Sequence, residues 1–280
     1  MALRNVSLLV LTLLLAASSG AYAGELDATC ALAGNRGGLV VHYDCGDGRL
    51  TAALGQRKDM VLQGLTRDAD QVATARERIH ASGLGGPVTI RLWTTQRLPY
   101  ADEVVNVLLA SEAIEGKEAA RVLAPGGALL VKGSLNAAAT GLKASESSSG
   151  WQSFVKPVPA EMDEWTHYLH AADNNAVAND SLVSPPRYLR WDGGPKYGRN
   201  HEIDASVISA VTGGGRLFYV VDEGPAGTMG QHLPQKWALI ARDAFSGVIL
   251  WLEYQAYKDA APPTGDGVLI DHRNTFSSRK

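Results

Sequence analysis

The chain has 280 residues, of which 45% are hydrophobic and 20% are charged. This composition is typical of a globular protein, and the length leaves room for about two domains. The formal net charge of −3 gives no basic surface of the kind that nucleic-acid binding requires, so DNA and RNA are not expected partners. Cys30 and Cys45 could form a disulfide in an oxidising compartment. Position 45 lies in a glycine loop, however, where any small residue would serve equally well, so a disulfide is not required.

The first 23 residues have the three-part pattern of a secretory signal peptide. Arg4 supplies the positive start, an apolar run covers Val6–Ala17, and Ala21 and Ala23 give the small-residue cleavage pattern. A membrane anchor is the alternative, but a spanning helix needs about 20 apolar residues and Ser18 interrupts this run earlier. We therefore expect cleavage after Ala23, export to the periplasm or the extracellular space, and a mature protein without a membrane span.

Residues 24–133 alternate strand-like runs with helical patterns. The strand-like runs are LVVHY (39–43), DMVLQGL (59–65), VTIRLW (88–93), EVVNVLLA (103–110) and ALLVKG (128–133). Within DADQVATARERIHAS, Val72, Ala75 and Ile79 fall on one face of a helix. Strands that alternate with helices predict an α/β doubly wound domain with a parallel sheet.

The composition changes after this domain. Residues 134–160 open with a segment rich in Ala, Ser and Gly that ends in SESSSG, which predicts a linker or a long loop. Over residues 161–280, turn-forming residues separate short runs of β-forming residues. These runs are SVISAV, RLFYVV, WALIA and VILWLE. Short strands at close spacing predict an all-β segment.

A glycine loop follows the first predicted strand. Gly46, Asp47 and Gly48 stand between that strand and a helical segment, where residues without bulky side chains let a ligand approach the backbone. Doubly wound sheets bind nucleotides at the loop that follows the first strand. We interpret this loop as a candidate cofactor site.

The runs CGDGRLT, RLPYAD and RVLAPGG together resemble the class I S-adenosylmethionine-dependent methyltransferase family over about residues 37–133. The resemblance implies a Rossmann-like fold and S-adenosylmethionine as the cofactor. It also implies cofactor contacts from Gly46, Asp47 and Gly48, with Asp44 or Asp68 substituting for missing acidic residues. No catalytic base is identified, and methyl transfer relies largely on positioning the nucleophile.

The sequence departs from the family pattern at the cofactor contacts. His42 stands where the family usually has an acidic residue, and Asp44 replaces the first glycine of the motif. Thr66 ends the second strand, where the family places a carboxylate that accepts both ribose hydroxyls, and a threonine hydroxyl cannot do so. In the loop after the third strand, residues 94–96 (TTQ) replace the usual acidic contact to adenine.

The run WALIARDAFSGVILWLE (237–253) predicts two strands joined by a tight turn. Asp243 can bond to the turn backbone, Gly247 can take a left-handed conformation, and Trp251 offers a large apolar side chain for burial. The spacing A-x-D-x-x-S-G-x-x-x-W is similar to the repeat of pyrroloquinoline-quinone-type β-propellers. Residues 163–195 resemble the segment that leads into the first blade of such propellers.

The chain holds about one such repeat, whereas a propeller closes only with several blades. We therefore interpret residues 161–280 as an incomplete propeller that belongs to a longer protein. The order of the two parts resembles that of exported bacterial proteins of the planctomycete type. In full-length quinoproteins the quinone is held by residues from many blades, so pyrroloquinoline quinone is not expected to bind here.

Two further groups of polar residues are candidate sites. His167 and His170, with Asp173, have a spacing that could hold a metal in a helical turn, but local hydrogen bonding explains them as well. Residues 199–204, with Arg, His, Glu and Asp, could line a propeller face or form a solvated loop. We predict no metal site.

Two functional hypotheses follow from the sequence. The preferred one is an exported binding or scaffolding protein without catalysis, whose partner is an unidentified protein or cell-envelope ligand. The substitutions at His42, Asp44 and Thr66 favour it, as does export away from the cytoplasm, where S-adenosylmethionine is made. The alternative is an active S-adenosylmethionine-dependent methyltransferase with the propeller as a recognition module, which the retained glycine loop and RVLAPGG favour.

Overall fold

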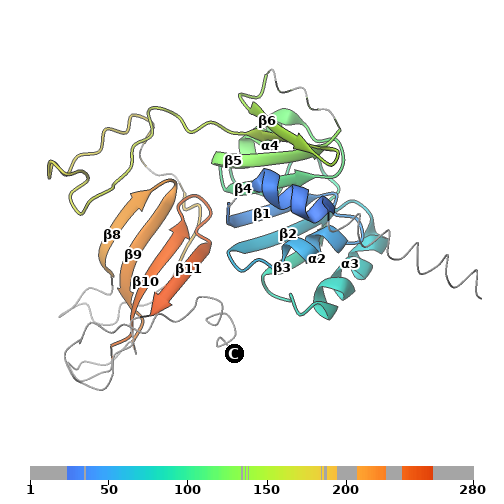
Figure 1. Cartoon of the computed structure of the whole chain (residues 1–280), viewed down its shortest axis with the longest axis horizontal. Coiled ribbons are helices and arrows are strands. Elements are labelled where there is room, and N and C mark those ends of the chain that lie inside the picture. The colour runs from blue at the N-terminus through green and yellow to red at the C-terminus, as the bar shows by residue number, and fades with distance from the viewer. Residues whose placement is uncertain are drawn as a thin grey trace, which may run out of the picture.

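The computed structural model describes residues 24–34, 36–133, 135, 137, 139–183, 185, 188–193, 207–224 and 235–254. These residues form two β-sheets that lie side by side (Figure 1). The predicted signal peptide and the polar stretch at residues 199–204 lie outside the described residues. None of the described helices is long and apolar enough to cross a membrane.

The first sheet has seven strands in the order β3-β2-β1-β4-β5-β7-β6. Its strands are β1 (Gly38–Tyr43), β2 (Met60–Thr66), β3 (Val88–Leu92), β4 (Val105–Ala110), β5 (Leu123–Lys132), β6 (Lys143–Ser148) and β7 (Trp151–Val155). Strands β1 to β5 are parallel, which confirms the predicted doubly wound α/β domain. The strand order reverses between β1 and β4, so the carboxyl ends of these two strands mark the switch point where such folds bind ligands.

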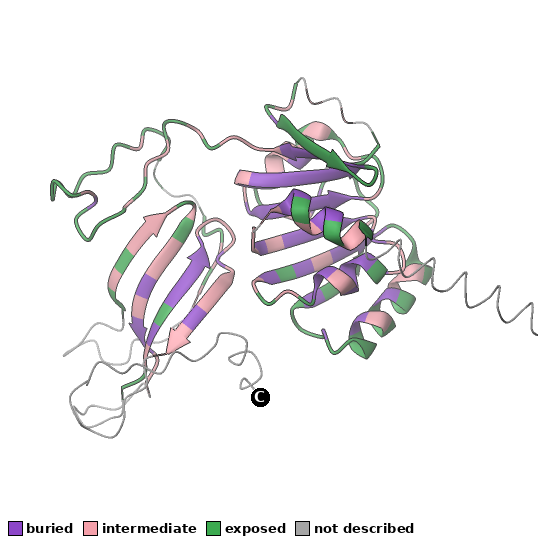
Figure 2. Ribbon diagram, in the orientation of Figure 1, coloured by how far each residue is buried: buried purple, intermediate pink, exposed green. Residues whose placement is uncertain are grey.

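Helices cover both faces of this sheet. A helix over residues 24–33, α2 (Arg49–Leu54) and α3 (Ala69–Ala81) pack on one face, and α4 (Gly116–Val122) packs on the other. Successive residues of each strand contribute to opposite core clusters, so the central strands are buried on both sides (Figure 2). Ala75 and Ile79 of α3 are buried as predicted. The helix over residues 24–33 was not predicted.

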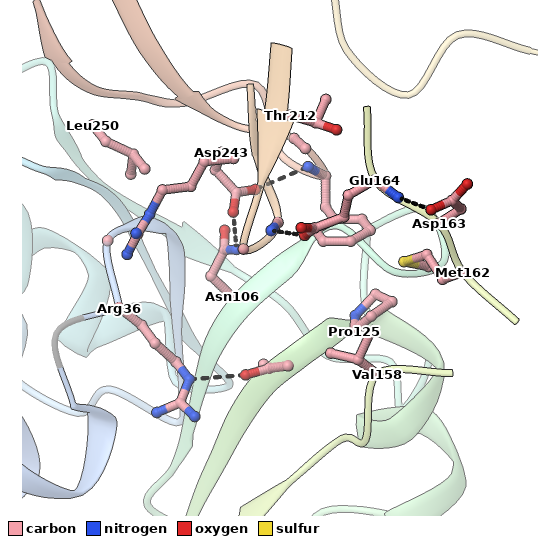
Figure 3. Close-up of a pocket in the computed structure, with 18 of the residues that line it drawn as sticks. Arg36, Asn106, Pro125, Val158, Met162, Asp163, Glu164, Thr212, Asp243 and Leu250 are labelled. Atoms are coloured by element: carbon pink, nitrogen blue, oxygen red, sulfur yellow. Dashed lines mark hydrogen bonds between the residues drawn. The ribbon is translucent and has the colours of Figure 1, made fainter. Parts of the chain in front are cut away.

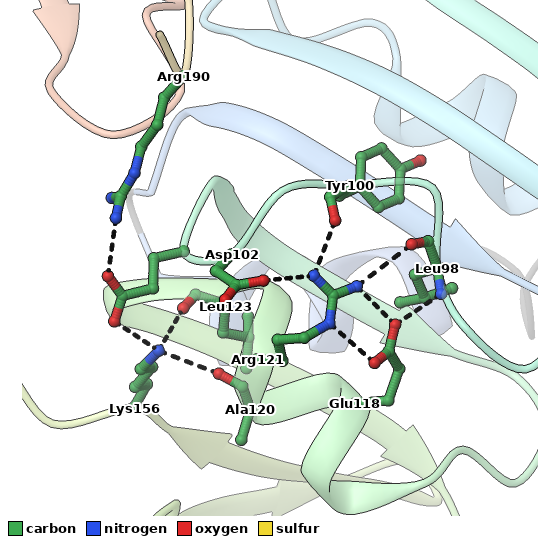
Figure 4. Close-up of polar contacts among 10 residues, drawn as sticks. Leu98, Tyr100, Asp102, Glu118, Ala120, Arg121, Leu123, Lys156 and Arg190 are labelled. Carbon is green, nitrogen blue, oxygen red and sulfur yellow. Dashed lines mark hydrogen bonds and ion pairs between the residues drawn. The ribbon is translucent and has the colours of Figure 1, made fainter. Parts of the chain in front are cut away.

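The linker predicted at residues 134–160 is wrong for residues 143–155, because β6 and β7 form a hairpin on the edge of the sheet. Strand β7 runs antiparallel to β5, and its Trp151 is fully buried. All six residues of β6 are exposed, so this strand has no apolar alternation by which the sequence could reveal it. Lys156, which follows β7, donates hydrogen bonds to Glu103 and to the carbonyls of Ala120 and Leu123 (Figure 4).

Arg121 joins the two sequence runs RLPYAD and RVLAPGG (Figure 4). Its guanidinium donates to the carbonyl oxygens of Leu98 and Tyr100 and forms ion pairs with Asp102 at 2.6 Å and Glu118 at 2.7 Å. The segment between β3 and β4 contains no helix, and this arginine holds it against α4. The hydrogen bond from Arg121 is the main cause that lowers the pKa of Glu118.

Replacing Glu118 by Gln should lower the free energy of unfolding by about 1–3 kcal/mol, because Arg121 would lose a mostly buried charged partner. The folded pKa of Glu118 lies below its ordinary value of 4.5, so its contribution is complete above that pH and declines as the pH falls further. Urea unfolding at about pH 7 and pH 3 should show a difference that shrinks in acid. The exposed Glu115 of the same region, replaced by Gln, is the control, and equal effects of the two substitutions would contradict the prediction.

The second sheet has four antiparallel strands in the order β11-β10-β9-β8. They are β8 (Val207–Gly213), β9 (Arg216–Asp222), β10 (Trp237–Asp243) and β11 (Ile249–Tyr254), which correspond to the four predicted runs. At the predicted turn, Gly247 has a φ of 72°, and the carboxylate of Asp243 accepts hydrogen bonds from the N–H groups of Phe245 and Ser246. The assignment of this sheet to a propeller stays a prediction.

A buried side-chain hydrogen bond joins the two sheets. The Nδ2 atom of Asn106 in β4 donates to Oδ2 of Asp243 at 2.7 Å, and its Oδ1 atom accepts from the backbone N–H of Leu39 at 2.8 Å. Gly38 has a φ of 97°, and a Cβ atom there would clash with the Asn106 side chain. The turn residue Asp243 therefore both orders its own turn and fixes the second sheet against the first.

Candidate functional site

The glycine loop lies at the carboxyl end of β1, at the switch point of the sheet. Asp44, Gly46 and Gly48 have φ angles of 54°, 54° and 75°, so the loop is left-handed at every second residue. A Cβ atom on Gly46 would meet only Oε1 of Gln71, at 3.7 Å, whereas one on Gly48 would press on Cβ of Ala75 at 3.0 Å. Gly48 thus lets α2 pack on α3, and Gly46 leaves the backbone open to a ligand.

Two residues predicted to contact the cofactor have partners within the protein. The carboxylate of Asp47 forms ion pairs with Arg49 at 2.9 Å and Arg78 at 3.1 Å. The carboxylate of Asp68 caps α3 by accepting a hydrogen bond from the N–H of Asp70 at 2.9 Å. Both side chains therefore stabilise local structure, and their contact with a cofactor stays a prediction.

The end of β2 offers no free carboxylate. Thr66 is fully buried, and its hydroxyl oxygen accepts a hydrogen bond from the N–H of Asp68 at 3.2 Å. In the loop after β3, residues 94–96 are exposed, and the hydroxyl of Thr95 donates to the carbonyl of Arg97 at 3.0 Å. A nucleoside bound beside these strands would find fewer acceptors than the family pattern supplies.

A carboxylate that the sequence analysis missed, Glu112, lies near Asp44 at the switch point. Burial is the main cause that raises the pKa of Asp44, the charge of Glu112 adds to it, and Arg67 opposes it. The chain segments after β1 and β4 stay paired, because the N–H of Ser111 donates to the carbonyl of Tyr43 at 3.1 Å. In the sequence, the one sign that Glu112 could belong to the site is its position just after a buried strand. The switch point therefore holds two carboxylates, with the charge of Arg67 offsetting part of their repulsion.

His42 occupies the place of the family's acidic residue and is buried within β1. Its Nδ1 atom lies 2.8 Å from the hydroxyl of Thr51 in α2, and its Nε2 atom lies 2.8 Å from the hydroxyl of Ser111 after β4. Burial lowers the pKa of His42 to about 4, and the charge of Lys132 acts in the same direction. The neutral ring links three elements of the domain, and it cannot supply the carboxylate contact that the family makes here.

The buried His42 should make stability depend on pH. Its folded pKa of about 4 is below its ordinary 6.5, so the unfolded state binds more protons between these values. Stability should be complete above pH 6.5 and decrease by about 3 kcal/mol as the pH falls to 4. Urea unfolding of wild type and of His42→Gln, across this range, should show that the substitution removes this slope. The exposed His80, replaced by Gln, should leave the slope unchanged.

Replacing Asp44 by Gly should raise the free energy of unfolding by about 1 kcal/mol, because glycine adopts a left-handed φ of 54° without a Cβ clash. Ser149, exposed in the turn between β6 and β7 with a φ of 51°, is a matched control for the backbone effect. Chemical denaturation of both glycine variants measures the gain. A loss of stability in Asp44→Gly alone would show that the Asp44 side chain stabilises the loop.

The helical turn that a metal site at His167 and His170 would require does not form. The two residues pair as an isolated antiparallel bridge, with backbone hydrogen bonds of 3.0 and 3.1 Å. The Nε2 atom of His170 lies 2.7 Å from Asp163, whereas Asp173 accepts from the N–H of Asn175. Across the part of the chain that the structure describes, no three His, Cys, Asp or Glu residues gather in a way that could hold a metal ion.

Cys30 and Cys45 are free thiols in this structure. Both contact the same core cluster, on the face covered by α2 and α3. Burial raises the pKa of Cys45 to about 12 and also raises that of Cys30. A Cβ atom on Gly64 would lie 2.8 Å from Sγ of Cys45, so the glycine in β2 makes room for this thiol.

Comparison with known proteins identifies the domain that carries the glycine loop. The family described as "Methyltransferase domain" matches residues 41–131, which run from β1 to β5. Residues 41–131 are a methyltransferase-like domain. Methyltransferase GfsG of Streptomyces halstedii is 32% identical over 117 residues, which cover 37% of this chain and 42% of that protein. The match thus spans less than half the length of this relative.

Solved structures similar to the chain include further methyltransferases. A putative S-adenosylmethionine-dependent methyltransferase of Methanococcus maripaludis matches with a TM-score of 0.43 and 13% identity, over 50% of this chain and 87% of that one. Geranyl diphosphate C-methyltransferase of Streptomyces coelicolor, solved with S-adenosyl-L-homocysteine, matches with a TM-score of 0.33 and 20% identity. That match covers 35% of this chain and 40% of the other.

Proposed function

We propose that the α/β domain binds S-adenosylmethionine at the glycine loop and transfers its methyl group to a substrate. The observation that carries this proposal is the loop itself, which is left-handed at Asp44, Gly46 and Gly48 and is open above Gly46. It stands at the switch point, where doubly wound sheets bind ligands. This function reverses the preference that the sequence alone suggested.

The charge of the switch point supports this choice of ligand. S-adenosylmethionine carries an ammonium and a carboxylate on its methionine part and a sulfonium that supplies an electrophilic methyl group, so its net charge is positive. Asp44 and Glu112 are close enough for their charges to interact; Arg67 offsets part of this repulsion, and the ammonium or sulfonium of a ligand would relieve it further. Gly46 would admit the methionine part of the cofactor to the backbone, and the two carboxylates would hold its cationic groups.

The residues around β2 and β3 fit the nucleoside part less well. Thr66 is buried and has no carboxylate, and Asp68 uses one carboxylate oxygen to cap α3, so the end of β2 offers fewer acceptors for the two ribose hydroxyls. We infer that the methionine part contributes most of the affinity. Because methyl transfer relies on positioning the nucleophile against the methyl group, this arrangement is compatible with catalysis.

Titration calorimetry with S-adenosylhomocysteine tests the proposal, and we expect micromolar binding. Gly46→Asn should weaken it at least tenfold, because asparagine tolerates the left-handed backbone but places a side chain in the open approach. Gly83, with a φ of 69° and nothing within 4 Å of a built Cβ, is the matched control and should bind normally as Gly83→Asn. No binding at millimolar ligand, or equal effects of the two substitutions, would overturn the proposal.

A second candidate is an exported binding protein without catalysis, whose ligand is a protein or a component of the cell envelope. The observation that favours it is that the carboxylates of Asp47 and Asp68 already have partners within the domain. Export rests on the pattern of the first 23 residues. The same titration separates the two candidates, since this one requires no affinity for S-adenosylhomocysteine.

A further inference from the structure

A cavity of about 580 Å³ lies between the two sheets (Figure 3). The first sheet lines it with the amino ends of β1, β4 and β5, through Gly37, Asn106 and residues 125–127. The second sheet contributes Thr212 and the turn that begins at Asp243. These amino ends lie at the opposite end of the strands from the glycine loop. The volume of the cavity is in the range of small-molecule sites, which often lie between domains.

Arginine side chains line this cavity without a carboxylate partner among the described residues. Arg36 donates from Nε to the carbonyl of Gly126 and from Nη1 to the carbonyl of Ala33, each at 2.8 Å. These acceptors are neutral, so the half-buried guanidinium keeps an uncompensated charge and further N–H donors. Arg216, at the start of β9, is exposed and also lines the cavity.

The carboxylates that line the same cavity accept hydrogen bonds from neutral N–H groups. Backbone N–H groups donate to Asp163, to Glu164 and to Asp180. Asp243 accepts from its own turn and from Asn106. These N–H groups lower the pKa of Asp163 and Asp180, which shows that they stabilise the ionised carboxylates. These donors are neutral, so the carboxylates keep their charge as Arg36 does. Asp163 and Glu164 lie on the other side of the cavity from Arg36 (Figure 3), so a ligand meets positive charge at the Arg36 end.

The rest of the wall is largely apolar. Pro125 and Val158 come from the first domain and the segment after it, and Figure 3 shows them beside Met162. Phe245 and Leu250 line the cavity from the second sheet. An apolar wall with a cationic group at one end suits a ligand that has an apolar body and an acidic head.

We propose that this cavity binds a small organic anion, with its carboxylate or phosphate group at Arg36 and its apolar body against Val158, Met162 and Leu250. Arg216 adds a second positive charge on the side of the second sheet. A guanidinium is the side chain best suited to such groups, because it donates two parallel hydrogen bonds to them. The site is separate from the proposed cofactor loop and does not depend on it.

The test uses two fluorescent probes with the same apolar body. 8-Anilinonaphthalene-1-sulfonate has an anionic group, and N-phenyl-1-naphthylamine lacks it. We expect Arg36→Gln to weaken binding of the sulfonate about tenfold or more and to leave binding of the neutral probe nearly unchanged. Arg91, exposed in β3 at the far edge of the sheet, is the control, and Arg91→Gln should bind both probes as wild type does.

A second variant keeps the test decisive if Arg36→Gln does not fold. Val158 is 58% exposed and lies near the turn at Gly126, so Val158→Trp should fill the cavity without removing the arginine. It should weaken the binding of both probes.

Competition by benzoate and by phenyl phosphate then shows which acidic head the site prefers. The proposal is overturned if Arg36→Gln binds the sulfonate as wild type does, or if Val158→Trp binds both probes normally. Neither result bears on S-adenosylhomocysteine binding.

Discussion

The side-chain amide of Asn106 is the contact on which the arrangement of the two sheets depends. One end of the amide accepts from β1 and the other donates to Asp243, so both of its polar atoms are satisfied in a buried position. Losing either partner would leave a buried polar group unpaired, which costs about 1–3 kcal/mol. The Asp243 carboxylate also orders the turn between β10 and β11. One carboxylate therefore stabilises both the local structure of the second sheet and its attachment to the first. Asn106 and Asp243 both line the cavity between the sheets, so this contact forms part of its wall.

The two ends of the parallel strands carry different functional side chains. The carboxyl ends of the strands gather the left-handed loop and the carboxylates of Asp44 and Glu112, with Arg67 beside them. The amino edge carries Arg36 and meets the second sheet. A ligand at one edge would lie a full strand length from a ligand at the other, so the two sites could be occupied together. The central strands that join them are buried on both faces, and they provide a rigid connection.

The parts of this fold that could be predicted from sequence are those with a strong local period. Val72, Ala75 and Ile79 identified α3, and the alternation of apolar runs identified β1 to β5. Strand β6 has no buried residue, so no periodicity marked it. The cavity at the amino ends of the strands could not be predicted either, because Arg36 and Arg216 line it together only through the packing of two segments distant in sequence. Glu112 was missed for the same reason, since its relation to Asp44 depends on β4 lying beside β1.

His42 and Asp44, two departures from the family pattern, are held in the structure by different contacts. The sequence presents both as losses from a family motif, but the structure gives His42 two hydroxyl partners that no motif position reveals. Asp44 keeps a left-handed φ of 54°, which aspartate tolerates better than most residues, and its carboxylate accepts a hydrogen bond from the backbone of Arg67. Both substitutions are therefore held by contacts that a comparison of motif positions does not reveal: the His42 ring by two hydroxyl groups, and the Asp44 carboxylate by the backbone of the next strand's loop. The loop keeps its left-handed backbone because its own side chains stabilise it.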